Sequence, residues 1–200
     1  MASPARHLRH MEGIAVRPQG GWWVASEGAE DFGQEGLTKN LLIRVNADGE
    51  VAEEVELPDV VNQQQRSNGF EGVATDCAGA RVYVAFQRER ADDPAGLIKI
   101  GRYTPATREW AFYYYPLDEA PVDGWVGLSE ITWLGDDTLL VVERDDQQRD
   151  NARVKRLYSV SVAGITPTPA GGTPPCSARR RCAIYWKRTI TAWKRSRALR

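Results

Sequence analysis

The sequence predicts an all-β protein organised as about three four-stranded β-propeller blades. Three observations support this: a repeat of 58 to 59 residues, short apolar segments bounded by turn residues, and no helical pattern longer than two turns. A four-stranded unit that recurs every roughly 40 to 60 residues is typical of propeller blades. Because closed propellers have about four to eight blades, we predict an incomplete ring, half of a six-bladed propeller.

The first half of each unit shows the repeat most clearly. A Glu-Gly pair opens an apolar segment at Glu12 and again at Glu71, and Glu130 stands one position displaced in the third unit. A turn and a second apolar segment follow each time. These second segments are residues 22–25, 82–85 and 139–142. Because they are almost entirely apolar, we expect them to be covered on both faces.

The second half of each unit repeats as well. Segments 41–45 and 97–103 lead through a turn to segments 51–57 and 110–115, and the prolines that follow, Pro58 and Pro116, are 58 residues apart. The third unit offers segment 155–162, a Gly-containing turn and residues 165–167 as its last strand. Val, Ile, Tyr and Trp favour strands, whereas Gly, Pro, Asn and Asp favour turns. The alternative is an ordinary antiparallel sandwich with chance internal similarity.

Charge is divided unevenly along the chain. The net charge is −1, yet all 27 acidic residues precede Ile165, and the last 25 residues carry nine Arg or Lys and no acid. We divide the chain into a disordered N-terminus (1–10), a partial propeller (11–169), and a Gly/Pro linker with a basic tail (170–200). The tail has neither a strand unit nor turns at the repeat spacing. We expect an out-of-frame read-through there; the alternative is a genuine tail for nucleic acid or an anionic membrane.

The remaining sequence features exclude several classes of protein. No apolar run reaches the roughly 18 residues of a membrane span, and the N-terminus lacks the apolar stretch of a signal peptide. Three cysteines (Cys77, Cys176 and Cys182) match neither a zinc pair nor a disulfide framework. We do not expect nucleic acid as a partner. The oligomeric state stays open, and two chains together could complete a six-bladed ring.

Three segments resemble a known family. They are EGIAVRPQGGWWVASE at 12–27, NGFEGVATDCAGARVYVA at 68–85, and LLVVERD at 139–145, followed by KRLY at 155–158. Together they are similar to the bacterial phytase-like family described as "esterase-like activity of phytase", over about residues 11–168. The resemblance implies an exported (periplasmic or extracellular) propeller that hydrolyses phosphate or carboxylic esters of small molecules. A full member would continue beyond Thr168, so we expect a C-terminally truncated propeller.

Carboxylates at the start of the repeated units form the first candidate site. If the first strand of each unit lies innermost, Glu12, Glu71 and Glu130 point towards a common axis. Converging carboxylates suit a hard cation such as Ca²⁺, which could polarise an ester oxygen and activate a water. The alternative is structural: the glycine permits close approach of a neighbouring backbone, and the glutamate accepts amide protons of a turn.

A second group of candidates lies at strand ends and on a loop. Glu143 and Arg144 are the candidate catalytic residues, because arginine binds phosphate or carboxylate in a bidentate manner. The alternative, which we favour for Glu143 and Arg144, is a salt-bridge network between blades. Arg66 and Asn68 are the candidate ligand-binding residues, although Asn-Gly is also a turn signal.

Other catalytic templates are missing from the sequence. The two histidines, His7 and His10, both lie in the N-terminal segment, which argues against a Ser-His-Asp triad. There is neither a nucleophile elbow nor a Walker-type phosphate loop. The resemblance to the phytase-like family implies a phytase-like or esterase-like hydrolase that acts on phosphate or carboxylic esters, and the converging carboxylates suggest that Ca²⁺ assists it. The alternatives are a propeller that binds a ligand or partner without catalysis, and a truncated fragment without function.

Overall fold

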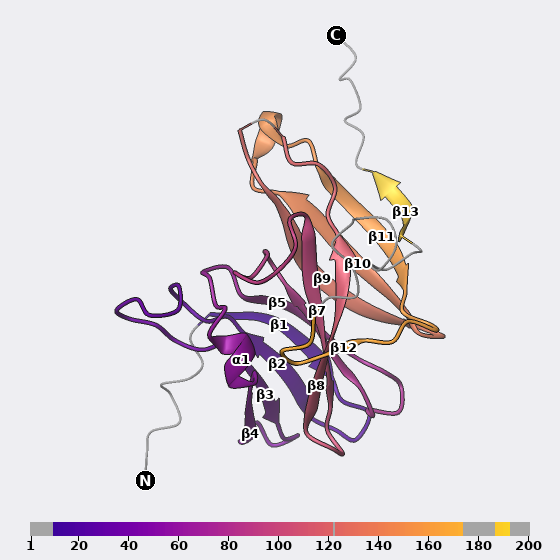
Figure 1. Cartoon of the computed structure of the whole chain (residues 1–200). Coiled ribbons are helices and arrows are strands. Elements are labelled where there is room, and N and C mark those ends of the chain that lie inside the picture. The colour runs from indigo at the N-terminus through magenta and orange to yellow at the C-terminus, as the bar shows by residue number, and fades with distance from the viewer. Residues whose placement is uncertain (1–9, 122, 174–186, 193–200) are drawn as a thin grey trace.

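The computed structural model describes residues 10–121, 123–173 and 187–192, and it confirms an all-β protein (Figure 1). The strands form three antiparallel sheets. Helix α1 (Asp59–Asn62) has only four residues, and no helix among the described residues is long and apolar enough to cross a membrane. Of the N-terminal segment for which disorder was predicted, residues 1–9 lie outside the described residues.

Sheet 1 contains the four segments predicted for the first unit, in the order β1-β2-β3-β4. Glycines in left-handed backbone conformations close its hairpins: Gly20 and Gly21 follow β1, and Gly49 follows β3. Only glycine adopts such conformations without strain. The strands are β1 (Met11–Val16), β2 (Trp22–Ser26), β3 (Leu41–Val45) and β4 (Val51–Glu56).

Sheet 2 contains the second unit and one additional strand, β12, which pairs with β8 at the outer edge. Residues 165–167, predicted as the last strand of the third unit, are not a strand, and that prediction is wrong. The chain instead turns at Gly164, at a φ of 70°, and continues to sheet 2. The strands are β5 (Phe70–Thr75), β6 (Val82–Phe86), β7 (Leu97–Thr104), β8 (Glu109–Pro116) and β12 (Thr168–Pro169).

Sheet 3 has the order β13-β11-β10-β9. Its outermost strand comes from the basic tail, for which the sequence predicted no strand unit. This strand, β13, runs antiparallel to β11, and tertiary pairing rather than local pattern accounts for it. The strands are β9 (Val126–Gly135), β10 (Thr138–Asp145), β11 (Lys155–Ser161) and β13 (Lys187–Ala192).

The first strands of the three sheets, β1, β5 and β9, lie side by side (Figure 1). Glycines permit this contact. A Cβ atom on Gly13 would lie 2.6 Å from the carbonyl oxygen of Glu71, and one on Gly72 would lie 2.6 Å from the amide nitrogen of Ile131. Both distances are too short for real carbon atoms. The structural interpretation of the glycine in each Glu-Gly pair therefore agrees with the structure.

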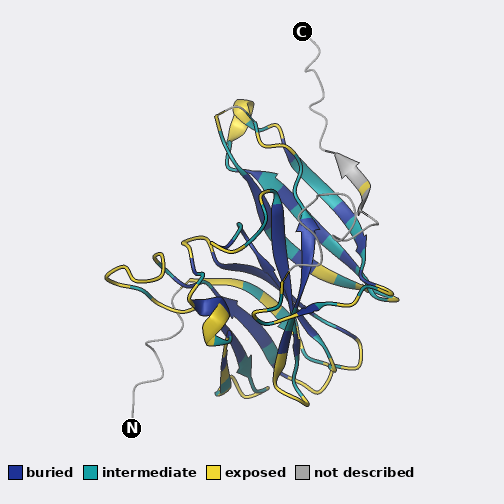
Figure 2. Ribbon diagram, viewed as in Figure 1, coloured by how far each residue is buried: buried dark blue, intermediate teal, exposed yellow. Residues whose placement is uncertain are grey.

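The main core lies between the three sheets, where the strands are buried and the loops are exposed (Figure 2). Tyr83 of β6 stacks on Trp133 of β9, with ring centroids 5.5 Å apart, and so joins sheets 2 and 3. Strand β6 is buried along its whole length, as predicted, but β10 alternates buried and half-buried residues.

Replacing Gly72 with alanine is expected to lower the free energy of unfolding by about 3 kcal/mol, because the methyl group must push β5 away from β9. Urea denaturation measures this change. Gly164→Ala is the control: a Cβ there meets no atom within 4 Å, so only the left-handed backbone costs energy, about 1 kcal/mol. Equal losses in the two variants would contradict the close packing of inner strands.

Candidate functional site

Acidic side chains gather around the inner strands. Glu12 of β1 and Glu130 of β9 line one hollow, together with Met11, Gly13, Ile14 and Val24. Glu71, at the start of β5, interacts electrostatically with both of them, with Glu27 and with Arg144. The structure thus brings the three predicted carboxylates into one neighbourhood and adds Glu27 and Arg144 to it.

Glu71 is the most perturbed of these acids. Its side chain is buried, with 9% of the residue exposed. Burial raises the pKa of Glu71 to about 7; the positive charge of Arg144 opposes this rise, and the carboxylates of Glu12, Glu27 and Glu130 add to it. A carboxyl group with such a pKa exchanges its proton near neutral pH, which is typical of a general acid or base.

Two of the neighbouring carboxylates bind backbone amides. Glu27 Oε1 accepts a hydrogen bond from the Gly69 N–H at 2.8 Å, and Glu130 Oε1 accepts one from the Ile131 N–H at 2.8 Å. Burial raises the pKa of both side chains. Within the described part of the chain, no three His, Cys, Asp or Glu side chains form a group that could hold a metal ion. Binding of Ca²⁺ by Glu12, Glu71 and Glu130 stays a prediction.

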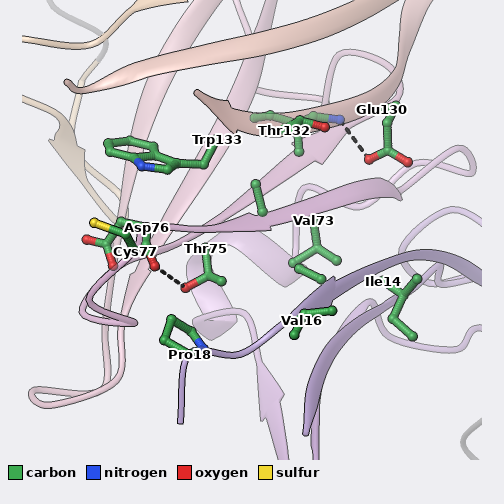
Figure 3. Close-up of a pocket in the computed structure, with 13 residues that line it drawn as sticks. Ile14, Val16, Pro18, Val73, Thr75, Asp76, Cys77, Glu130, Thr132 and Trp133 are labelled. Carbon is green, nitrogen blue, oxygen red and sulfur yellow. Dashed lines mark hydrogen bonds between the residues drawn. The ribbon is translucent and has the colours of Figure 1, made fainter. Parts of the chain in front are cut away.

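A groove of about 410 Å³ runs along the three inner strands (Figure 3). Apolar and polar residues both line it, and none of the described residues in its lining is Arg or Lys. Glu130 lies at one end, whereas Asp76 and the exposed, free Cys77 lie at the other. The apolar lining consists of Ile14, Ala15, Val16, Pro18, Val73, Ala74, Ile131 and Trp133.

Arg144 follows the buried Glu143 and lies against an indole ring. Its guanidinium carbon is 5.4 Å from the centroid of the Trp125 ring, and that of Arg88 is 4.6 Å from the same ring. Trp125 comes directly before β9, and Arg88 follows β6. No signal in the sequence singled out Trp125 and Arg88, because their proximity depends on the contact between sheets 2 and 3.

Glu143 is completely buried. Its Oε2 atom accepts a hydrogen bond from the Tyr115 hydroxyl at 2.5 Å, and Oε1 accepts one from the Asp118 N–H at 2.7 Å. Asp118 in turn accepts hydrogen bonds from Tyr158, at 2.5 Å, and from Arg156. These hydrogen bonds link β8 of sheet 2 with β10 and β11 of sheet 3. The salt-bridge network between blades that we favoured for Glu143 and Arg144 stays a prediction.

Arg66 and Asn68 are exposed on the loop between α1 and β5. Asn68 adopts a φ of 73°, a conformation for which Asn is enriched, so the turn explains its presence. The backbone carbonyl of Arg66 accepts a hydrogen bond from Arg90 at 3.1 Å. Among the described residues, no hydrogen bond or ion pair joins either side chain to Glu71 or Arg144. The structure therefore does not connect the predicted ligand-binding pair, Arg66 and Asn68, to these two residues.

Asn40 is a residue of this region that the sequence did not reveal. It is completely buried, and its Oδ1 atom accepts hydrogen bonds from the N–H groups of Gly28, at 3.0 Å, and Phe70, at 2.8 Å. Its amide group donates to Gln65 Oε1 at 3.1 Å. Asn40 thereby holds the backbone next to both Glu27 and Glu71. Asn40 could not be predicted from the sequence, because a single asparagine at the end of a long loop belongs to no recognisable motif.

Comparison with known proteins identifies the family. The family model "Phytase-like: Esterase-like activity of phytase" matches residues 3–178. The chain belongs to this family. The resemblance seen over about residues 11–168 is thus confirmed and extended, and the phytase-like match includes the inner strands, Glu71 and Arg144. Family membership supports an esterase-like or phosphatase-like domain.

Other comparisons are more distant. The search of curated proteins found no match. Among solved structures, the phytase-like chain is similar to "Kuenenia stuttgartiensis Hydrazine Synthase", with 12% sequence identity and a TM-score of 0.43. The similarity covers 84% of this chain and 48% of the other. The chain therefore spans about half the length of that solved protein.

Proposed function

We propose that this phytase-like chain hydrolyses phosphate or carboxylic esters at the carboxylate end of its inner strands. The observation that carries the proposal is the buried carboxyl group of Glu71, whose pKa is raised to about 7 beside Arg144. Burial and neighbouring like charges are the usual means by which a carboxylic acid becomes an acid-base group at neutral pH.

In the proposed reaction, the Glu71 carboxylate takes a proton from a water molecule as the water oxygen bonds to the ester phosphorus or carbonyl carbon. The bond to the leaving alkoxide then breaks, and Glu71 returns the proton to that alkoxide, which leaves as an alcohol. Arg144 stabilises the negative charge that develops on the non-bridging oxygen. The nearby Glu12, Glu27 and Glu130 raise the proton affinity of Glu71.

The groove beside these residues would hold the organic part of the substrate. Its apolar wall, which includes Ile14, Val16 and Val73, suits an alkyl or aryl group. A Ca²⁺-assisted reaction would use Glu12, Glu71 and Glu130 as ligands. Since the described carboxylates do not form a metal-binding group, the proposed proton transfer is assigned to Glu71 and depends on no metal.

We also propose that the three sheets are three blades of an incomplete, six-bladed ring. In each sheet the inner strand comes first in the chain, and the other strands follow it outward in chain order. The three inner strands lie next to one another. Leu134 of β9 is a large apolar side chain that is exposed. A further sheet or a second copy of the chain would cover such a side chain.

Hydrolysis of p-nitrophenyl phosphate and p-nitrophenyl acetate tests the proposed function. We expect Glu71→Gln to lower kcat about 100-fold, and the wild-type rate to rise as the pH passes through about 7, where Glu71 becomes a carboxylate. Glu109→Gln, at an exposed position of β8, is the matched control and should keep the wild-type rate. A rate that falls on addition of EDTA and recovers with Ca²⁺ would favour the metal-assisted form.

Other outcomes separate the alternatives. A Glu71→Gln variant as active as Glu109→Gln would contradict the role of Glu71. If the wild-type chain releases no p-nitrophenol but unfolds cooperatively on heating, a non-catalytic binding protein is the better description. If it neither hydrolyses these esters nor unfolds cooperatively, the chain is a fragment without a folded function.

A further inference from the structure

Arg88, Trp125 and Arg144 come together because of a glycine. In the pairing of β9 with β10, Gly127 lies opposite Arg144, and the side chains of directly opposite residues point to the same face of a sheet. A Cβ atom on Gly127 would lie 2.3 Å from the Gln87 carbonyl oxygen, 3.0 Å from the Trp125 ring and 3.3 Å from Arg88 Cδ. The Gln87 backbone, Trp125 and Arg88 therefore occupy the space above Gly127, on the face that carries Arg144.

The backbone of Trp125 is bound to Asp146 on both sides. Asp146 Oδ1 accepts a hydrogen bond from the Trp125 backbone N–H at 3.1 Å, and the Asp146 backbone N–H donates to the Trp125 carbonyl at 3.1 Å. Both guanidinium groups lie within 5.4 Å of the ring centroid, which is a cation–π distance. A guanidinium held in this way keeps its N–H groups available for a planar acceptor.

These guanidinium groups have donors to spare. Arg88 Nε is buried and makes no hydrogen bond within the described part of the chain; its nearest carboxylate oxygen, Glu89 Oε2, is 3.6 Å away. Arg144 makes a hydrogen bond of 3.5 Å to the Asp145 carbonyl, at the long limit for such a bond. Each arginine has five N–H donors, and most of these donors have no partner among the residues that the structure describes.

Each arginine has a carboxylate near it. Glu89 is 3.6 Å from Arg88, although Glu89 Oε1 also accepts a hydrogen bond from the Gly96 N–H at 3.2 Å, and Glu71 interacts electrostatically with Arg144. A pocket of about 480 Å³ adjoins Arg88 and Trp125; Glu89, Asp118 and Glu119 also line it, and Asp118 is paired with Arg156. An anion that binds the two arginines therefore competes with Glu89 for Arg88 and with Glu71 for Arg144.

We propose that Arg88, Trp125 and Arg144 form an oxyanion-binding site for the phosphate or carboxylate group of an anionic ester. Arginine and oxyanion would meet through charge-assisted, bidentate hydrogen bonds. This proposal deepens the proposed function. It rests on that function in one respect, namely that the bound anion is part of the substrate. Binding of the anion itself does not depend on hydrolysis.

Titration of the full chain with inorganic phosphate, and separately with acetate, tests the site at constant ionic strength. Calorimetry and tryptophan fluorescence report binding. We expect Arg88→Gln, Arg144→Gln and Arg88→Lys each to weaken phosphate binding at least about tenfold, since a hydrogen bond to a charged group contributes about 1.5 to 3 kcal/mol. Glu89→Gln should strengthen binding several-fold. Arg108→Gln, which removes an exposed arginine in the β7–β8 turn, is the control and should bind as the wild type does.

Several results would overturn the proposal. One is the absence of a heat or fluorescence change with either anion; another is an equal loss of binding in Arg108→Gln, which would indicate a general charge effect. If only phosphate binds, the substrate class is phosphate esters. If phosphate and acetate both bind, the substrate class also includes carboxylates. Anion binding without ester hydrolysis would leave the site in place and contradict the catalytic role of Glu71, so the two failures are distinguishable.

Discussion

Replacing Glu143 with alanine is expected to lower the free energy of unfolding by about 3 to 5 kcal/mol. The carboxylate is completely buried and accepts hydrogen bonds from the Tyr115 hydroxyl and the Asp118 amide. Alanine would deprive both donors of this acceptor, which costs about 1 to 3 kcal/mol for each group left unsatisfied. It would also leave a cavity between sheets 2 and 3, and cavities add to the cost.

Urea denaturation of a matched set of variants checks this expectation. Tyr115→Phe removes one hydrogen bond and should cost about 1 to 2 kcal/mol, whereas Glu109→Ala, at an exposed position, should change stability by about 0.5 kcal/mol or less. If Glu143→Ala unfolds like the wild type but no longer hydrolyses esters, the catalytic interpretation of Glu143 is correct and the structural one is wrong.

Replacing Asn40 with alanine is expected to cost about 2 to 5 kcal/mol, because two buried backbone N–H groups, those of Gly28 and Phe70, lose a single shared acceptor. The neighbouring backbone is closely fitted to this side chain: a Cβ atom on Gly69 would lie 1.8 Å from Asn40 Oδ1. Loss of the amide therefore loosens the loops that position Glu27 and Glu71, and we expect ester hydrolysis to fall together with stability.

Two further variants give this measurement its controls. Asn40→Asp keeps an acceptor for both N–H groups and should retain more stability than Asn40→Ala. Asn151→Ala removes an exposed asparagine and should leave the thermal unfolding temperature close to that of the wild type. Similar unfolding temperatures for Asn40→Ala and Asn151→Ala would show that the buried amide does not hold the loops together.

Much of the fold was predictable because its signals are local. Turn residues such as Asp48-Gly49 and the apolar segments of the first two units predicted eight strands with nearly correct limits. The last part of the third unit was not predictable in this way. Residues 165–167 have strand-like composition and were expected to form the last strand of the third unit. The structure instead pairs β11 with a strand from the basic tail, and the next residues, Thr168–Pro169, pair with the outer edge of β8.

One part of the candidate site was likewise predictable from the sequence, and another part was not. The equivalent positions of Glu12 and Glu71 in the repeat, with Glu130 displaced by one position, predicted that their carboxylates would approach one another, and Glu71 has both others as electrostatic neighbours. Arg66 and Asn68 were predicted to bind a ligand because of their place on a loop, and within the described part of the chain no hydrogen bond or ion pair joins their side chains to Glu71. Trp125 could not be predicted, because its two arginine partners come from different sheets.

By itself, the sequence determined the strand segments, the hairpin turns and the inner position of the Glu-Gly strands, because period, turn chemistry and the size of glycine act over a few residues. Only the tertiary structure decided which charged groups are buried and which are free to react. Glu143 continues the alternation of buried and half-buried residues along β10, and the contact between sheets 2 and 3 buries its carboxylate, whereas Arg144, the next residue, lies against Trp125. Burial depends on the packing of distant segments, and packing is what sets the proton affinity of Glu71 and the role of each neighbouring charge.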